Sequence, residues 1–187
     1  METTVLCDLL KLKNGEILFQ KSANTFISLN RDVELFLKEK ALQSAKLYTS
    51  STYLVAEGSD FAGYFTLATK MLTLSPENIS SAQAKIIKRF VSLDSDTNTF
   101  RLPAVLLAQF GRNFSKESVS ITGIRLMENA LEHINKVVSL SSGKIAFLEC
   151  EPKDCLISFY NKCGFRLLNN VVCSKSNKSL VQMFRVI

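Results

Sequence analysis

Residues that bind metals are scarce in this chain. It has a single histidine, His133, and five cysteines whose number is odd and whose spacings match no metal-binding motif. Because structural zinc is held by clusters of cysteine and histidine, this composition argues against a zinc site. We therefore expect no metal, and we expect reduced thiols at Cys7, Cys150, Cys155, Cys163 and Cys173.

A catalytic cysteine also lacks support in the sequence. Such a thiol is activated by a neighbouring histidine, and His133 lies in a helical stretch among charged residues. We expect His133 to be a surface or half-buried helix residue. Cys150, Cys155 and Cys163 are expected to be structural, packing as small apolar side chains around a strand and the helix that follows it.

Long hydrophobic runs and targeting signals are missing too. No apolar run approaches the length of about 18 residues that marks a transmembrane helix. The first residues, Met1–Thr4, lack the basic region and the small-residue cleavage site of a signal peptide. Together with the cysteines, these absences predict a cytoplasmic protein that does not enter a membrane.

The composition that is present suits one globular domain over residues 1–187. Apolar residues make up 47% of the chain, which includes 13 phenylalanines, and charged residues make up 21%. This is enough for a sizeable core and excludes a disordered chain. The formal net charge of +6 favours an anionic partner, such as a nucleotide cofactor, RNA or an acidic protein, or marks an ordinary basic protein.

The N-terminal part predicts a helix followed by a hairpin. Val5–Leu12 fits either a strand or a short helix. Asn30 is the expected N-cap of the first clear helix, because acidic residues follow it in the first turn. Thr52–Ala56 and Phe61–Ala68 are the expected arms of a hairpin.

The middle of the chain predicts a buried strand and an amphipathic helix. Leu72–Arg101 is irregular and contains one helix near Ser81–Val91. Leu102–Ala108 is a near-continuous apolar run, which fits a strand buried on both faces. In the helix that follows, apolar residues recur in steps of three and four: Ile124, Met127, Leu131, Ile134 and Val138.

The C-terminal part predicts a strand at Lys144–Glu149, a helix at Asp154–Cys163 that Gly164 ends, and two strands at Phe165–Leu168 and Leu180–Val186. Two strand–helix–strand crossovers imply parallel neighbours, whereas the hairpin and the tail imply antiparallel ones. The order therefore predicts an α/β fold with a mixed central sheet and helices on both faces.

Three stretches, in this order along the chain, resemble the GNAT superfamily of N-acetyltransferases. Leu102–Asn113 (LPAVLLAQFGRN) resembles the family's splayed central strand, and Ser118–Leu131 resembles its cofactor turn and helix. Phe159–Phe165 (FYNKCGF) matches the family element Phe-Tyr-x-x-x-Gly-Phe. Gly63–Leu67 in the hairpin is similar to GNAT proteins of the bacterial toxin branch.

The resemblance implies a GNAT fold with splayed central strands and a core over residues 52–187. Residues 1–51 would be an N-terminal helical and strand part of the same domain. The resemblance further implies an acyltransferase that moves an acetyl group from acetyl-CoA, its co-substrate, to an acceptor amine. The toxin branch implies aminoacyl-tRNA as acceptor and an antitoxin as partner, and a homodimer is left open. The alternative is a catalytically silent binding module with the same fold.

The cofactor turn departs from the family's pattern, which reads Arg/Gln-x-x-Gly-x-Gly/Ala. The corresponding residues are Ser118, Val119, Ser120, Ile121, Thr122 and Gly123, of which only Gly123 matches. Because a helix N-terminus holds phosphate through its backbone N–H groups and its dipole, the resemblance still places the pyrophosphate here. Hydroxyls of Ser118, Ser120 and Thr122 are expected as additional donors, and Ile121 adds bulk near the backbone.

The resemblance also implies roles for residues of the central strand and the last helix. Pantetheine would pair with the main chain of Phe110, Gly111 and Arg112, and the ring of Phe110 also fits a core position. Tyr160 matches the family tyrosine that often protonates the leaving thiolate, because a phenol with a pKa near 10 keeps its proton at neutral pH. The alternative for Tyr160 is a buried aromatic whose hydroxyl only finds a partner.

Two further questions stay open at this point. No general base stands out, since Glu149, Glu151 and Asp154 all fit solvated carboxylates. The basic residues of the irregular segment have two interpretations, a lip for an anionic acceptor such as aminoacyl-tRNA or a solvated helix face. They are Lys85, Lys88 and Arg89.

Overall fold

The computed structural model describes residues 1–115, 121–141, 143–173 and 179–187. The described strands are β1 (Glu2–Val5), β2 (Ser51–Glu57), β3 (Asp60–Leu74), β4 (Phe100–Arg112), β5 (Ile145–Cys150), β6 (Arg166–Cys173) and β7 (Ser179–Val186). The described helices are α1 (Leu6–Leu9), α2 (Gly15–Thr25), α3 (Arg31–Leu35), the π-helix η1 (Phe36–Lys40), α4 (Ala41–Lys46), the 3-10 helix η2 (Pro76–Asn78), α5 (Ser81–Ile87), α6 (Gly123–Ser141) and α7 (Asp154–Lys162).

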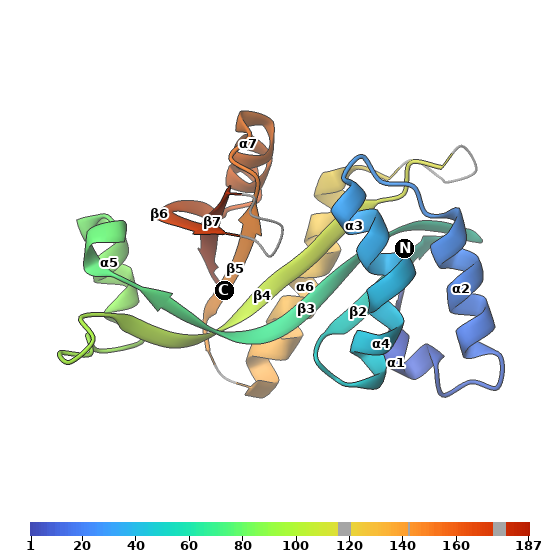
Figure 1. Ribbon diagram of the computed structural model, residues 1–187, viewed down its shortest axis with the longest axis horizontal. Helices are drawn as coiled ribbons and strands as arrows, with labels where there is room; N and C mark the ends of the chain where they lie inside the picture. Colours follow the sequence, from blue (N-terminus) through green and yellow to red (C-terminus); the bar gives the residue numbers. More distant parts are fainter. Residues whose placement is uncertain (116–120, 142, 174–178) are drawn as a thin grey trace. The chain divides into compact units, whose positions relative to one another are not determined.

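The strands form a mixed seven-stranded sheet in the order β1-β2-β3-β4-β5-β7-β6. The chain divides into two compact units, and Figure 1 labels the helices and strands. Unit 1 consists of Met1–Ala68 and Leu107–Glu132, and unit 2 consists of Thr69–Leu106 and His133–Ile187. The predicted α/β fold with a mixed sheet is therefore confirmed.

Unit 1 contains the predicted hairpin. Strands β2 and β3 pair antiparallel, with Leu54 opposite Tyr64, and β1 adds to the other edge of β2. Helices α1 to α4 gather beside β2 (Figure 1). Their inward side chains share one core with the hairpin, made of Leu6, Phe19, Ala23, Phe26, Leu37, Ala41, Ala45, Leu54 and Tyr64.

Local sequence signals predicted some of the N-terminal helices and missed others. Asn30 is the N-cap of α3 as predicted, since its side-chain oxygen accepts a hydrogen bond from the N–H of Asp32 (2.9 Å). Val5–Leu12 resolves into the end of β1 and the short helix α1. Helix α2 was not predicted, because its apolar residues are split between buried Phe19 and exposed Ile17.

Unit 2 is built on the antiparallel strands β5, β7 and β6. The segment Leu72–Arg101, expected to be irregular, contributes directly to its core. Its helix α5 is tied to β6, because the Gln83 side-chain amide donates to the carbonyl of Leu167 (2.7 Å). The buried core residues are Leu72, Leu74, Ile79, Ile87, Phe100, Leu102, Ala104, Ile145, Phe147, Leu168 and Phe184.

The second predicted crossover does not join neighbouring strands. The C-terminal strand β7 lies between β5 and β6 and pairs antiparallel with both. A strand in this position satisfies the backbone N–H and C=O groups along both of its edges. Strands β5 and β6 therefore run in the same direction without being neighbours.

Two predicted burial patterns need correction. Strand β4 is not buried on both faces along its length, because Pro103 is exposed between buried Leu102 and Ala104. In α6, Ile124 is exposed, whereas Leu126 is fully buried. The buried face of this helix is therefore displaced from the one that the sequence predicted.

Candidate functional site

The C-terminal end of β4 is held closely by its neighbours in unit 1. A Cβ atom added to Gly63 of β3 would lie only 2.6 Å from the carbonyl oxygen of Gly111, and 3.2 Å from Leu126 of α6. A Cβ atom added to Gly111 would lie 2.7 Å from Cγ1 of Val33 and 3.2 Å from the Phe26 ring. The strand thus has α6 on one face and the α2–α3 region on the other.

Asn113, directly after β4, is a buried polar residue whose side chain joins three segments. Its oxygen accepts hydrogen bonds from the N–H of Ile27 (3.0 Å) and of Ser115 (3.1 Å). Its side-chain amide donates to the carbonyl of Phe61 (2.9 Å). Because a buried amide is stable only when its hydrogen bonds are made, this residue fixes the end of β4 to both segments.

Arg112 connects the end of β4 to the start of α6. Its Nη1 donates to the carbonyl of Ile121 (2.7 Å), and its guanidinium lies over the ring of Phe114, 4.4 Å from the centroid. The main chain of Arg112 belongs to the stretch Phe110–Arg112 that was predicted to bind pantetheine. Its side chain brings a positive charge to the turn that was predicted to bind the pyrophosphate.

The N-terminus of α6 has the form that an anion site requires. Thr122 caps the helix, since its hydroxyl oxygen accepts from the N–H of Arg125 (3.2 Å). An α-helix leaves its first N–H groups without partners inside the helix, and here these belong to Gly123 and Ile124. They point along the helix axis toward the position where an anion is favoured by the dipole.

The bulk of Ile121 does not obstruct this turn. Its side chain is 2% exposed and therefore contributes to the core. Ile121, which stands where the family pattern has its first glycine, is thus buried. Ser118, Val119 and Ser120, which complete the predicted pyrophosphate site, lie outside the described residues.

Tyr160 lies in unit 2 on α7, which forms as predicted and ends at Gly164 with a φ of +85°. Its ring makes edge-to-face contacts with Phe159 (5.1 Å) and Phe165 (6.1 Å). Burial, assisted by the nearby thiols of Cys150 and Cys163, raises the pKa of the Tyr160 phenol well above its usual value. The phenol therefore keeps its proton at neutral pH, as a proton donor must.

The described cysteine side chains differ in exposure, and Cys7 is half-buried. Cys150 and Cys163 are buried, as predicted, and burial with the nearby charge of Glu151 raises the pKa of Cys150 to about 11. The prediction was wrong for Cys155, which is exposed on the first turn of α7. His133 is half-buried in α6, as predicted.

Two of the three acidic residues considered near α7 have contacts of their own. Glu149 accepts a hydrogen bond from the Gln182 amide (2.8 Å), and Glu151 pairs with Lys153 (2.5 Å). Asp154 is exposed. Within the described part of the chain, no group of acidic, histidine and cysteine side chains is arranged to hold a metal ion.

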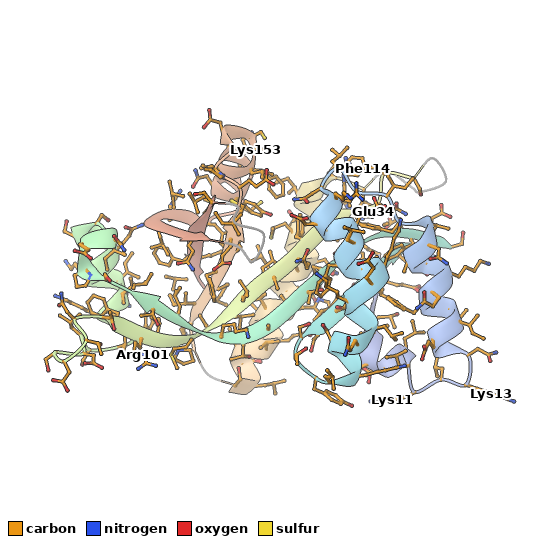
Figure 2. The ribbon with its side chains drawn as sticks, viewed as in Figure 1. Lys11, Lys13, Glu34, Arg101, Phe114 and Lys153 are labelled. Carbon is orange, nitrogen blue, oxygen red and sulfur yellow. The ribbon has the colours of Figure 1, made fainter. Side chains whose placement is uncertain are left out.

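The basic residues of the irregular segment are exposed: Lys85, Lys88 and Arg89. Lys85 lies in α5, Lys88 is the C-cap of that helix and Arg89 follows it, and their exposure agrees with a solvated surface. Arg101, at the start of β4, is exposed in the same unit (Figure 2). No helix in the described ranges is both long and apolar enough to span a membrane.

Sequence patterns did not reveal the residues that hold the end of β4. The role of Asn113 depends on partners 52 and 86 positions away in the chain. Glu34 differs, because its partners are local: its Oε2 accepts from the N–H of Ser28 (3.0 Å), and its Oε1 pairs with Lys38 (2.7 Å) four residues on. The sequence pointed to Asn113 only through its position, as the last residue of the stretch Leu102–Asn113 that resembles the central strand.

No protein-family model matches this sequence, and no curated protein matches it at a significant level. Solved structures do match its fold. AtaT complexed with acetyl-methionyl-tRNAfMet is 15% identical with a TM-score of 0.61 over 85% of each chain. A tyrosine-to-phenylalanine mutant of KacT is 15% identical with a TM-score of 0.64, covering 97% of this chain and 94% of that one.

A third match is a tyrosine-to-phenylalanine mutant of the AtaT toxin, bound to the C-terminus of the antitoxin AtaR and to acetyl-CoA. It is 14% identical with a TM-score of 0.55, covering 88% of this chain and 84% of that one. These are GNAT-fold toxins. The chain described here therefore has the GNAT fold, as the resemblance predicted.

Proposed function

We propose that this protein is an acetyl-CoA-dependent N-acetyltransferase of the toxin type, with an aminoacyl-tRNA as its acceptor. The observation that carries this proposal is the shared fold with AtaT, whose solved complexes contain acetyl-CoA in one case and acetyl-methionyl-tRNAfMet in another. An antitoxin partner is part of the same proposal, because AtaT was solved with a segment of AtaR.

Acetyl-CoA would supply an activated acetyl group as a thioester. The residues of unit 1 would hold it at two places. The first N–H groups of α6, at Gly123 and Ile124, and the guanidinium of Arg112 would face its phosphates. The main chain of Phe110–Arg112 would pair with pantetheine in the manner of an added strand. The tight packing around Gly111 keeps that part of the strand in a fixed position.

Tyr160 is the proposed proton donor. Acetyl transfer requires a neutral amine to attack the thioester carbonyl, and the departing sulfur then takes up a proton. A phenol is protonated at neutral pH and so carries a proton to donate, while the burial that raises the pKa of Tyr160 makes it a weaker acid. The matched structures include one tyrosine-to-phenylalanine mutant of KacT and one of AtaT, which fits a functional role for a tyrosine in proteins of this fold.

The test compares the wild-type protein with Tyr160→Phe. Calorimetric titration measures acetyl-CoA binding, and transfer of labelled acetyl to aminoacyl-tRNA measures turnover. We expect wild type to bind acetyl-CoA and acetylate the tRNA-linked amine, and its induced expression to arrest growth. The variant should lose roughly 10²–10⁴-fold in kcat with little change in acetyl-CoA affinity.

The alternative function is a silent binding module with the GNAT fold. It predicts no acetyl transfer to any amine, with or without acetyl-CoA binding. Absence of acetyl-CoA binding in the folded wild-type protein would favour it directly. If Tyr160→Phe retained normal turnover, the protein would still be an acetyltransferase, but Tyr160 would be a core residue and not the proton donor.

A further inference from the structure

The last turn of α7, the helix that carries Tyr160, is held by a residue from outside the helix. Nη1 of Arg185 in β7 donates to the carbonyl of Cys163, the residue that caps the C-terminal end of α7. The two residues are 22 positions apart, and both belong to unit 2. The contact therefore joins the end of the helix to a strand that has neighbours on both sides.

A helix as short as α7 depends on such partners for its last turn. It has nine residues, whereas isolated helices shorter than about 12–15 residues are marginal in water. The last carbonyl groups of an α-helix have no partners inside the helix, and the dipole there favours a cation. Arg185 provides both a hydrogen-bond donor and a positive charge at this position.

The chain that follows α7 packs against Tyr160. The N–H of Phe165 donates to the carbonyl of Tyr160 (3.0 Å), and the two rings make an edge-to-face contact with their centroids 6.1 Å apart. Because Phe165 is fully buried, it fixes one side of the Tyr160 ring. The backbone between these two aromatic residues includes Cys163, whose carbonyl Arg185 binds.

Gly164 leaves the space that Arg185 occupies. Its φ of +85° turns the chain out of the helix in a conformation that favours glycine. A Cβ atom added at Gly164 would lie 3.0 Å from Nη1 and 3.3 Å from Cζ of Arg185. The guanidinium thus lies where the side chain of another residue would begin, so the glycine permits the contact between Arg185 and Cys163.

The backbone of Arg185 is itself fixed. Strand β7 pairs antiparallel with β5, where Arg185 lies opposite Ala146, and it also pairs antiparallel with β6. The preceding residue, Phe184, is buried in the core of unit 2. Arg185 is half-buried, and hydrogen bonds with a charged donor are stronger than neutral ones. The strand therefore provides a firm support for the end of α7.

We infer that Arg185 is a positioning residue for Tyr160, because its hydrogen bond to the Cys163 carbonyl fixes the last turn of α7 and with it the Tyr160 hydroxyl. A proton donor must lie within hydrogen-bond reach of the atom that it protonates, and a misplacement of about 1 Å costs on the order of 10²-fold in rate. The inference rests on the proposed function, in which Tyr160 protonates the leaving sulfur, and adds the residue that keeps this donor in place.

The experiment removes the arginine in the presence and in the absence of the tyrosine. Arg185→Gln and Arg185→Lys are each made in the wild-type protein and in Tyr160→Phe. Arg166→Gln is the matched control, because Arg166 is an exposed arginine at the start of the neighbouring strand β6. Thermal unfolding, calorimetric titration with acetyl-CoA, and kcat for acetyl transfer to aminoacyl-tRNA are measured for every protein.

Arg185→Gln should lower kcat by about tenfold or more. Acetyl-CoA affinity should stay at the wild-type value, because the proposed cofactor contacts belong to unit 1. Arg185→Lys keeps a charged donor without the planar fork and should lower kcat less, by about threefold. In Tyr160→Phe either substitution should cost less than about twofold, since residues that act as a unit have non-additive effects. Arg166→Gln should leave kcat unchanged.

Equal losses of kcat with and without the tyrosine would overturn the inference, because Arg185 would then act on the fold and not through Tyr160. A normal kcat in folded Arg185→Gln, or normal turnover of Tyr160→Phe, would overturn it as well. If Arg185→Gln does not fold, Arg185→Lys takes its place. An unchanged kcat in that variant, or the same loss in both backgrounds, is then the contrary result.

Failure of the proposed function is a separate result, seen as absent acetyl transfer by the folded wild-type protein. NMR with ring-labelled tyrosine then decides whether Arg185 fixes Tyr160. The chain has four tyrosines, and the Tyr160 signal is the one that Tyr160→Phe lacks. A shift of this signal in the Arg185 variants, but not in Arg166→Gln, supports the inference. No shift, or the same shift in the control, overturns it.

Discussion

The side-chain oxygen of Asn113 accepts a hydrogen bond from the backbone N–H of Ile27, which lies 86 positions earlier in the chain. The bond joins the end of β4 to the loop that precedes α3. The loop and the strand segment proposed to bind pantetheine are thereby held together within unit 1.

Replacing Asn113 with Ala should destabilise the protein by about 2–4 kcal/mol. The change removes the partner of the N–H of Ile27 and of the carbonyl of Phe61, both in part-buried hydrogen bonds, and leaving such a group unsatisfied costs about 1–3 kcal/mol. Urea unfolding measures the difference. Asn24→Ala, at an exposed position of α2, is the control and should change stability by less than about 0.5 kcal/mol. Similar stabilities of the two variants would contradict the role of Asn113.

Gly111→Ala should destabilise by about 1–3 kcal/mol, the usual cost of overpacking a tight site. The added methyl group would meet Cγ1 of Val33 at 2.7 Å. Val33→Ala removes that atom, so the double variant should recover part of the loss, and a double-mutant cycle by urea unfolding measures the coupling. Additive effects of the two substitutions would mean that the clash is relieved elsewhere.

Tyrosine burial predicts a loss of stability at alkaline pH. Burial raises the pKa of Tyr64 well above its usual value. Above about pH 10 the unfolded chain releases this proton and the folded chain keeps it, so the unfolding free energy falls as pH rises. The slope contributed is about 1.4 kcal/mol per pH unit for each such tyrosine.

Tyr64→Phe tests this directly. It should reduce the alkaline slope, and near pH 7 it should cost about 0.5–1.5 kcal/mol because the hydroxyl donates to the carbonyl of Val33 (2.5 Å). The exposed Tyr48 provides the control, since Tyr48→Phe should leave the slope unchanged. Identical slopes in the Tyr64 variant and wild type between pH 9 and 11 would be the contrary result.

Thiol reactivity should follow exposure. The exposed Cys155 should react with iodoacetamide at pH 8 at least about tenfold faster than the buried Cys150, whose pKa is raised to about 11, because the thiolate is the reactive form. Mass spectrometry of timed digests gives both rates. Alkylation of Cys155 alone should not change turnover. If alkylation abolished turnover while the protein stayed folded, a thiol mechanism would be indicated.

The proposed pyrophosphate turn can be tested at its two ends. Gly123→Val adds a branched side chain where α6 begins and should weaken acetyl-CoA binding at least as much as Ser118→Ala, which removes a hydroxyl only. Calorimetry measures both dissociation constants, and circular dichroism confirms that the helix is retained. Negligible effects in both variants would place the phosphates elsewhere.

Much of the local structure followed from the sequence. The N-cap at Asn30, the hairpin and the end of α7 at Gly164 were predicted correctly, because caps, tight turns and positive φ angles depend on a few adjacent residues. The resemblance in Leu102–Asn113 and Phe159–Phe165 predicted the fold that the solved structures match. The catalytic and cofactor roles assigned to Tyr160, Phe110–Arg112 and the 118–123 turn stay predictions, as does the single domain.

Tertiary structure alone decided features that depend on distant partners. The sequence did not indicate that β7 would pair between β5 and β6, since either order leaves the same apolar pattern within each strand. It did not show that Ile121 points inward or that Ile124 is exposed, because the side of a helix that is buried depends on what packs against it. Asn113 and Ile27 meet for the same reason: their contact exists only once the strands and helices of unit 1 have assembled.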